Sequence, residues 1–317
     1  MEIIYKKAVV TFIDILGFSE IVKTMSAEEV YNVLTLISSE AQSDFGGKMR
    51  HIINNYLSGT ELLEKLGWTG VSNAPSLNVI RFSDSIVRIR FDEPSCEFVR
   101  DCVISEFTSL PFIQSRLMKM GILIRGAVTI GKIFYNEEKN IVYGPAMIRA
   151  YELERDIALY PRIIIDPKIA NFCADMNDYD WKNNRDICID FDGMMYIDYL
   201  DENPLKLEYL SKKDANNKEQ IIYEIERISE LRDYMVNLIQ LIFNGNKAKK
   251  EISEKIAIKY SWIFTHYNRV CSNIYQVAKD SNYDGEYPEY LPINLVEISK
   301  NIVHDIENIR KEQGEST

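Results

Sequence analysis

Two aspartates stand at predicted strand ends, where carboxylates can bind a metal ion together. Asp14 follows the apolar, β-branched start of residues 8–18, and Asp84 lies between the apolar halves of residues 77–91. On neighbouring strands of one sheet, the two carboxylates would repel each other without a cation between them. Mg²⁺ or Mn²⁺ fits, because these ions prefer oxygen ligands and keep coordination positions open for substrate phosphates. Turn formation and helix capping are the alternative roles for such aspartates.

The residues after Asp14 form a candidate phosphate site. Ile15, Leu16 and Gly17 lead from the predicted strand into a predicted helix at Phe18. Backbone N–H groups at the beginning of a helix have no partner within it and can hold a polyphosphate. The sequence has no GxxxxGK[ST] motif, so this turn is not a Walker loop.

The composition argues against several classes of protein. The chain has 317 residues, 46% of them hydrophobic, and a net charge of −11. Such an acidic surface repels nucleic-acid backbones, so we expect no nucleic-acid partner. Five widely spaced cysteines without a CxxC pair, and three scattered histidines, argue against a zinc site and a disulfide framework. With no signal sequence and no apolar run of the ~20 residues that a membrane helix needs, we expect a soluble, cytoplasmic protein.

The elements that would position the two aspartates follow an α+β order. Residues 8–18 predict a buried strand, and residues 77–91 predict a hairpin with Asp84 at its tip. Ser26 and Glu29 have the spacing of a capping box, which predicts the beginning of a helix. The expected elements after the hairpin are a helix over 95–120 that is kinked or broken at Pro111, strands over 122–134 and 141–143, a helix from Ala146, a strand over 160–165, and a hairpin of 187–191 with 194–199. This order predicts one sheet with helices packed mainly on one face.

A second, helical domain is expected after Pro204. Apolar residues recur there at helical spacing in three stretches, 221–242, 256–277 and 295–309. They predict three long amphipathic helices packed as a bundle. We therefore divide the chain into a domain of residues 1–204, which carries both aspartates, and a helical domain of residues 205–317.

Several motifs resemble those of class III nucleotidyl cyclases, in the same order along residues 8–200. The stretch FIDILGF at 12–18 is similar to their first metal motif, and FSD at 82–84 to the hairpin with their second metal aspartate. The stretch RGAVTIG at 125–131 is similar to the strand that follows, and YGPA at 143–146 to the place where those enzymes begin a helix with catalytic side chains. The resemblance implies an α+β, ferredoxin-like cyclase domain with two Mg²⁺ or Mn²⁺ ions per site.

Two isoleucines stand where purine cyclases carry the side chains that select the base. Ile80 and Ile141 replace a lysine and an aspartate, and neither can hydrogen-bond adenine through its side chain. The motifs, with AYELE at 150–154, are more similar to the pyrimidine cyclases of bacterial Pycsar anti-phage systems. That resemblance implies a homodimer with shared active sites, which converts UTP or CTP to 3′,5′-cyclic UMP or cyclic CMP. It also implies a separate effector that responds to the cyclic nucleotide.

The resemblance does not identify which cationic side chains would contact the substrate phosphates. The family's transition-state asparagine and arginine correspond to Ile148 and Glu152, and its phosphate-binding lysine falls within residues 190–192. A replacement cation from a shifted position would come from one of three arginines, Arg149, Arg155 and Arg162.

The resemblance also implies roles for individual residues. Asp14, Asp84 and the backbone carbonyl of Ile15 would bind the metal ions, and Arg125 would act with the aspartates in catalysis. The residues expected to contact the substrate are Gly17, Phe18, Ile80, Tyr143 and Arg149. The alternatives are an ion pair with a carboxylate at the sheet edge for Arg125, a place in the core for Tyr143 and a surface role for Arg149.

Two functions from other classes compete with a pyrimidine cyclase. A cyclase-like domain that has lost turnover would be a nucleotide-binding or scaffold protein. The missing purine-cyclase residues favour that alternative, and the retention of both aspartates opposes it, since two facing carboxylates are costly without a cation. Another palm-type enzyme that makes or joins nucleotides, such as a relative of the diguanylate cyclases, is the weaker alternative, because the sequence has no GGDEF-like run. Dependence on Mg²⁺ or Mn²⁺ separates the enzymes from the scaffold.

Overall fold

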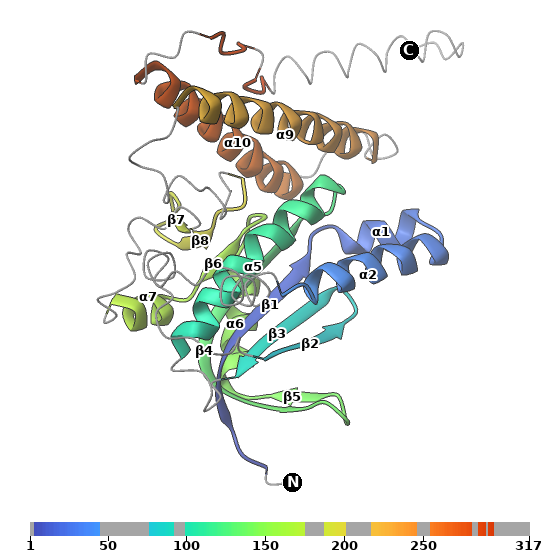
Figure 1. Cartoon of the computed structure of the whole chain (residues 1–317). Helices are drawn as coiled ribbons and strands as arrows, with labels where there is room; N and C mark the ends of the chain where they lie inside the picture. Colours follow the sequence, from blue (N-terminus) through green and yellow to red (C-terminus); the bar gives the residue numbers. More distant parts are fainter. Residues whose placement is uncertain are drawn as a thin grey trace. The chain divides into compact units, whose positions relative to one another are not determined.

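The computed structural model describes residues 3–44, 76–91, 99–174, 187–200, 217–245, 254–280, 285–289 and 291–294. The chain forms two compact units, Met1–Lys212 and Lys213–Thr317. The first contains a sheet with helices packed on it, and the second contains long helices (Figure 1). Residue 204, where the sequence placed the boundary between two domains, lies outside the described residues.

The sheet of the first unit has eight strands. Its long central strands are β1 (Lys6–Ile15) and β4 (Ile124–Asn136), which pair antiparallel along the whole of β1. The others are β2 (Leu77–Phe82), β3 (Ser85–Phe91), β5 (Ile141–Tyr143), β6 (Ile163–Ile165), β7 (Ile187–Ile189) and β8 (Met195–Ile197). The order across the sheet is β2-β3-β1-β4-β6-β8-β7, and β5 pairs with β4 outside this path.

Strands β2, β3, β1 and β4 form a ferredoxin-like arrangement. Each runs antiparallel to its neighbours in the sheet. Helices α1 (Phe18–Thr24) and α2 (Ala27–Ala41) lie between β1 and β2 in the chain, and α5 (Val99–Lys119) lies between β3 and β4. This β-α-β-β-α-β order, with β1 and β3 at the centre, confirms the predicted α+β, ferredoxin-like fold class. Helix α6 (Pro145–Asp156) then leads to β6, which extends the sheet parallel to β4.

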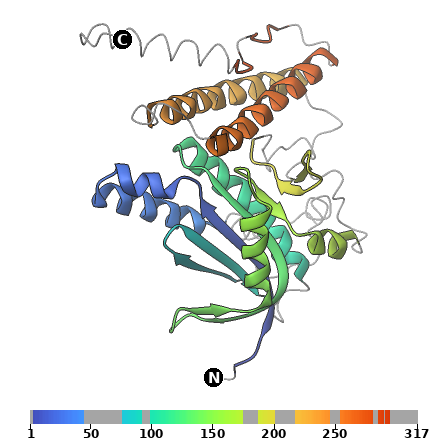
Figure 2. The ribbon, with the colours of Figure 1, turned by 180° about the vertical axis from the view of Figure 1, so that it is seen from behind.

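Helices cover both faces of the central strands. On one face, Val9 and Ile13 of β1 belong to a core that includes residues of α2 and α5. On the other, Val10 and Phe12 belong to a core that includes residues of α6. Figure 1 shows α5 in front of the sheet, and Figure 2 shows α6 on the opposite face. Burial on both faces explains why residues 8–13 of β1 are apolar at every position except Thr11, rather than alternating with polar residues.

Local signals in the sequence determine how the helices begin. The Ser26 hydroxyl accepts a hydrogen bond from the Glu29 N–H at 3.3 Å, and the Glu29 carboxylate accepts one from the Ser26 N–H at 2.7 Å, which confirms the capping box of α2. Gly144 precedes α6 with φ 145°, and a Cβ there would lie 2.8 Å from the Lys132 carbonyl oxygen, so this position requires glycine. Helix α5 continues through Pro111 to its end, so the predicted break does not occur there.

The second unit contains α9 (Asn217–Gly245) and α10 (Glu254–Asp280), where periodicity predicted the first two helices. The buried hydroxyl of Tyr267 lies 2.9 Å from the Ile228 carbonyl oxygen and 3.0 Å from that of Leu291. The third predicted helix, 295–309, falls outside the described residues. Of the helices that the structure describes, none combines the length and the apolar character that crossing a membrane requires.

Candidate functional site

Asp14 and Asp84 lie at the same edge of the sheet, at the ends of neighbouring strands. Asp14 is opposite Ser85 in the antiparallel β1–β3 ladder, and Asp84 belongs to the two-residue turn between β2 and β3. The Ile15 N–H donates a hydrogen bond to the Asp84 carbonyl oxygen at 3.2 Å, which fixes this turn against the end of β1. The fold therefore brings together the two aspartates that the sequence singled out.

Arg125 lies beside Asp14 and is held by three contacts. It is opposite Asp14 in the β1–β4 ladder, and its Nε is 3.2 Å from Asp14 Oδ2. Its Nη2 is 2.7 Å from Oε1 of Glu154 on α6, and its Nη1 donates to the Ala158 carbonyl oxygen at 3.4 Å. The side chains of Arg125, Asp14 and Glu154 are 17%, 19% and 4% exposed, so water screens their charges only in part. The ion pair with a carboxylate at the sheet edge is thus present in the structure.

Gly126 allows β1 and β4 to approach closely next to these three charges. A Cβ at Gly126 would lie 2.3 Å from the Phe12 carbonyl oxygen, so any side chain would force the strands apart. The Gly126 N–H donates to the Arg162 carbonyl oxygen at 3.1 Å, which joins β4 to the start of β6. The Arg-Gly pair of the sequence motif therefore combines a charged residue that faces Asp14 with a position that must lack a side chain.

The oxygen atoms around Asp14 fit a hard divalent cation. Asp14 and Asp84 both offer carboxylates, and Mg²⁺ is commonly bound through one or two carboxylates while it keeps several waters. Within the described residues, no three or more His, Cys, Asp or Glu side chains gather to hold a metal ion. An ion at Asp14 and Asp84 would therefore need further ligands from water, substrate or backbone. Arg125 would compete with it for Asp14 Oδ2.

Gly17 and Phe18 stand at the start of α1, directly after β1. Gly17 is the N-cap residue and has φ 79°, a left-handed conformation that glycine adopts without strain. Its carbonyl oxygen accepts a hydrogen bond from the Ile21 N–H at 3.2 Å. The Phe18 side chain packs against the core that includes α5. Their contact with substrate phosphates stays a prediction.

Two other predicted substrate residues lie on strands that do not pair with Asp14: Ile80 is on β2, two strands from β1, and Tyr143 is on β5. Ile80 is buried in the core that includes α6. Tyr143 pairs with Phe134, at the opposite end of β4 from Arg125, and its ring contacts that of Phe134 with a centroid distance of 4.9 Å. Tyr143 is 41% exposed, so the alternative prediction, a place in the core, is wrong.

Arg149, the remaining predicted substrate residue, is bound to the buried carboxylate of Asp166. Its Nε and Nη2 lie 3.1 and 3.3 Å from the two carboxylate oxygens. Asp166 precedes α7 (Pro167–Ala174) and accepts further hydrogen bonds from the Thr129 hydroxyl at 2.6 Å and the Lys168 N–H at 3.2 Å. Burial opposes ionisation of Asp166, but these hydrogen bonds hold its pKa below the ordinary value. In this structure Arg149 secures the start of α7.

Among the three candidate replacement cations, Arg162 is the one that lies next to Arg125. It directly precedes β6, and β6 pairs with β4 immediately after Arg125. Its fully buried guanidinium forms ion pairs with Asp190 and Asp192 in the turn between β7 and β8. The segment that corresponds to the family's phosphate-binding lysine therefore carries two carboxylates that neutralise a neighbouring arginine. Arg155 pairs on the surface with Asp156.

Aromatic rings complete the surroundings of Arg162. Its guanidinium lies 5.1 Å from the ring centroid of Tyr160 and 5.7 Å from that of Tyr196, within the range of cation–π attraction. Burial alone would raise the pKa of Asp192, but its hydrogen bonds to Arg162 lower it below the usual value. The guanidinium is thus enclosed by opposite charges and by rings.

Glu154 is the residue of the Asp14 cluster that the sequence analysis did not single out. It lies within the AYELE motif, but the motif does not say which way the side chain faces. Ala146, Ala150 and Glu154 are spaced by four residues, so they share one face of α6, and all three are buried. The sequence signal that could have identified Glu154 is its spacing of four and eight residues from Ala150 and Ala146, which places it on the same helix face as two small apolar residues.

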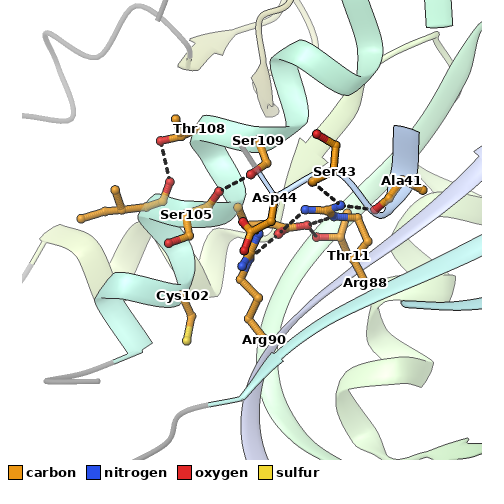
Figure 3. A network of polar contacts seen from close by, with 12 residues as sticks. Thr11, Ala41, Ser43, Asp44, Arg88, Arg90, Cys102, Ser105, Thr108 and Ser109 are labelled. Atoms are coloured by element: carbon orange, nitrogen blue, oxygen red, sulfur yellow. Dashed lines mark hydrogen bonds and ion pairs between the residues drawn. The ribbon is translucent and has the colours of Figure 1, made fainter. Parts of the chain in front are cut away.

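A second charged cluster lies on the opposite face of β1 and β3 (Figure 3). Glu106 of α5 pairs with Arg88 at 2.6 Å and with Arg90 at 2.7 Å, and the Thr11 hydroxyl donates to it at 2.9 Å. Burial alone would raise the pKa of Glu106, but the two arginine charges lower it to about 2. Arg90 also pairs with Asp44 at 2.7 Å. The cluster fixes α5, and the chain just after α2, to the sheet.

The chain has distant similarity to solved structures. No family model matches the sequence, and no curated protein matches it. Among solved structures, the chain is similar to the monomeric guanylyl cyclase domain of the RhoGC fusion protein from the aquatic fungus Blastocladiella emersonii. The two are 14% identical, the match covers 61% of this chain and 94% of that one, and the TM-score is 0.35. A match at this TM-score does not support an inference about function, so the assignment rests on the residues described above.

Proposed function

We propose that the chain is a nucleotidyl cyclase that converts UTP or CTP to 3′,5′-cyclic UMP or cyclic CMP and pyrophosphate. The observation that carries this proposal is the pairing of β1 with the β2–β3 hairpin, which puts Asp14 and Asp84 side by side. Arg125, opposite Asp14 in the β1–β4 ladder, adds a cation at the same edge of the sheet. The order of the cyclase-like motifs along the chain also supports the proposal.

In the proposed reaction, the ribose 3′ oxygen attacks the α-phosphorus of the same nucleotide. A bond forms between these two atoms, the bond from the α-phosphorus to pyrophosphate breaks, and the 3′-hydroxyl proton passes to water. Because both reacting atoms belong to one molecule, the protein contributes mainly orientation and stabilisation of charge. Two Mg²⁺ or Mn²⁺ ions at Asp14, Asp84 and the Ile15 carbonyl would lower the pKa of the 3′-hydroxyl and hold the triphosphate.

The protein residues around Asp14 would orient it before the substrate binds. Arg125 holds the Asp14 carboxylate through Nε, while its other two nitrogens contact Glu154 and Ala158. A side chain held in this way on a strand is positioned more rigidly than one on a loop. We further propose that backbone N–H groups at Gly17 and Phe18 bind the β- and γ-phosphates.

The preference for a pyrimidine is proposed from the two positions that select a purine in the related enzymes. Ile80 is buried in an apolar core, where a charged side chain would be costly. Ile141 is partly exposed but offers no hydrogen-bonding group. Neither isoleucine side chain can form the hydrogen bonds by which the related enzymes select adenine or guanine.

Exposed apolar side chains support a homodimer with shared active sites. Ile148 and Tyr151 on α6, and Phe82 next to the Asp84 turn, are each more than a third exposed. Apolar side chains gathered on a surface are typical of an interface between proteins. We propose that the partner subunit completes the substrate site. We also propose that the cyclic nucleotide acts in the bacterial cytoplasm, where a separate effector responds to it in anti-phage defence.

One observation favours the alternative, a cyclase-like protein that binds nucleotides without turning them over. Arg125 already neutralises part of the Asp14 charge, so Asp14 and Asp84 do not require a metal ion as strongly as the sequence suggested. Such a protein would bind a nucleotide whether or not a divalent cation is present.

The test is incubation of the purified protein with each of the four nucleoside triphosphates and Mn²⁺, with products identified by mass. We expect cyclic UMP or cyclic CMP from the wild type and neither from Asp14→Asn or Asp84→Asn. Asp156→Asn is the control, because Asp156 pairs with Arg155 on the surface. A cyclic purine would contradict the proposed base preference. A folded dimer that forms no product from any of the four would favour the nucleotide-binding alternative.

A further inference from the structure

Arg125 is shared between two carboxylates that come from different elements of the fold. Its Nε contacts Asp14 of β1 at 3.2 Å, and its Nη2 contacts Glu154 of α6 at 2.7 Å. The two contacts use different nitrogens, so one guanidinium serves both carboxylates at once. With one positive and two negative side chains, the cluster carries a formal charge of −1.

We propose that Glu154 is a positioning residue that shares Arg125 with Asp14 and thereby sets the affinity of Asp14 for a divalent cation. This inference rests on the proposed function, because it takes Asp14 as a metal ligand. Glu154 itself lies behind Arg125 and touches neither metal nor substrate in this scheme. Its effect is transmitted through the arginine.

The argument follows from the charges of the three side chains. With Glu154 ionised, the Arg125 charge is divided between two carboxylates, and Asp14 retains a net attraction for a cation. Without the Glu154 charge, the guanidinium would neutralise Asp14 fully, and the cluster would have no net charge. Glu154 is only 4% exposed, so little water lies near it to screen the change. Loss of the Glu154 charge should therefore weaken the attraction of Asp14 for a cation.

The geometry of α6 explains why Glu154 stays where it is. Ala150 and Ala146, one and two turns earlier on the same face, are buried against the sheet and bring the helix close to β1 and β4. The Ala158 carbonyl oxygen, just after the helix, contacts Nη1 of Arg125 at 3.4 Å. Arg125 is thus held from the side of α6 by two groups, which limits how far it can move toward Asp14.

The test is Mn²⁺ binding to the purified full chain, measured by calorimetric titration and by the paramagnetic resonance of free Mn²⁺, without nucleotide. The variants are Glu154→Gln and the double variant Glu154→Gln with Arg125→Gln. Asp156→Asn is the matched control, since it removes one negative charge from the end of the same helix but on the surface. Asp14→Asn reports whether the ion binds at Asp14 at all.

We expect Glu154→Gln to weaken Mn²⁺ binding on the order of tenfold, the scale on which outer partners of metal ligands act. The double variant should bind Mn²⁺ to within roughly threefold of the wild type, because its cluster again carries −1. Mn²⁺ binding is compared only between folded variants, because removal of both members of a buried ion pair can also restore stability without any effect on the site. In the double variant the charges of Glu154 and Arg125 are both removed, and only the 19%-exposed Asp14 carboxylate loses its arginine, so this variant remains informative if Glu154→Gln does not fold.

Three results would overturn the inference. Mn²⁺ binding by Glu154→Gln equal to that by Asp156→Asn would show that Glu154 does not act on the site. Binding by the double variant no tighter than that by Glu154→Gln would show that Arg125 does not carry the effect. Either result leaves the proposed cyclase intact if Asp14→Asn loses the ion. Equal binding by wild type and Asp14→Asn, or none by wild type, would overturn the proposed metal site together with this inference.

Discussion

Asp14 and Arg125 face each other across the β1–β4 ladder, and their side chains form an ion pair with 3.2 Å between Oδ2 and Nε. On its other side, Asp14 is opposite Ser85, the residue that follows Asp84. The row across the sheet is therefore Ser85, Asp14 and Arg125, with Asp84 one residue beyond it in the β2–β3 turn. Strand pairing alone brings together groups that are far apart in sequence, and this edge of the sheet is the proposed binding site for a triphosphate with its cations.

The two aspartates should differ in their contribution to stability. Asp14→Asn removes an ionic partner of Arg125, so we expect the free energy of unfolding to fall by about 1–2 kcal/mol. Asp84 makes no ion pair with any residue that the structure describes, so Asp84→Asn should change this free energy by less than ~0.5 kcal/mol. Urea unfolding followed by circular dichroism measures both. Equal losses in the two variants would contradict the Asp14–Arg125 ion pair.

Acid should destabilise the chain through Glu106. Its pKa is about 2 in the folded protein against 4.5 as the ordinary value, so the unfolded chain takes up the proton first. The stabilisation is present above pH 4.5 and is lost as the pH falls toward 2, at a total cost of about 3 kcal/mol. Unfolding by urea at a series of pH values between 6 and 2 measures this slope.

The control for Glu106 uses two variants. Glu106→Gln leaves Arg88 and Arg90 buried with less opposite charge, so we expect a loss of about 3–5 kcal/mol near neutral pH. The remaining dependence on pH below 4.5 should be shallower than in the wild type. Glu28→Gln changes an exposed glutamate in the first turn of α2 and should lower the free energy of unfolding by less than ~1 kcal/mol. A wild-type slope retained in Glu106→Gln would show that other carboxylates cause the acid sensitivity.

Arg162 should be far less tolerant of substitution than Arg155, although each arginine pairs with aspartate. Lysine lacks the planar fork that reaches Asp190 and Asp192 together, and it cannot stack on Tyr160 as a guanidinium does. We expect Arg162→Lys to lower the free energy of unfolding by about 2 kcal/mol. Arg155→Lys alters an exposed pair and should cost less than ~0.5 kcal/mol. Thermal and urea unfolding of the two variants measure these losses. Equal losses of free energy in Arg162→Lys and Arg155→Lys would show that the Arg162 ion pairs contribute nothing to stability.

The fold was predictable from sequence because its signals are local. The apolar run of β1, the capping box of Ser26 and Glu29, and the glycine before α6 each determine an element by themselves. The order of those elements then limits the sheet to few topologies. The continuity of α5 through Pro111 was not predictable, since the packing of a buried helix can outweigh the loss of one hydrogen bond.

The site was predictable only where residues stand at strand ends. Asp14 and Asp84 could be placed together because neighbouring strands of a sheet align such ends. The partners of the arginines could not, because a charged side chain reaches across several residues and finds its carboxylate in tertiary structure. Arg149 binds Asp166, Arg162 binds Asp190 and Asp192, and Arg125 binds Asp14 and Glu154. No sequence spacing relates these pairs, and only Glu154, in line with buried alanines, left a local signal.

The proposed homodimer predicts that an exposed residue of α6 is needed for activity. Ile148 is 58% exposed in the isolated chain, and a charge there would be buried in a dimer that uses this face. We expect Ile148→Asp to sediment as a monomer at micromolar concentration, since charges at interface centres are strongly disfavoured. The proposed cyclase activity should fall roughly tenfold or more. Tyr31→Asp is the matched control, because Tyr31 is 69% exposed but lies on α2, on the opposite face of the sheet from α6. An Ile148→Asp monomer with full activity would show that one subunit holds the complete site, and the missing phosphate-binding cation would then have to be found within the chain itself.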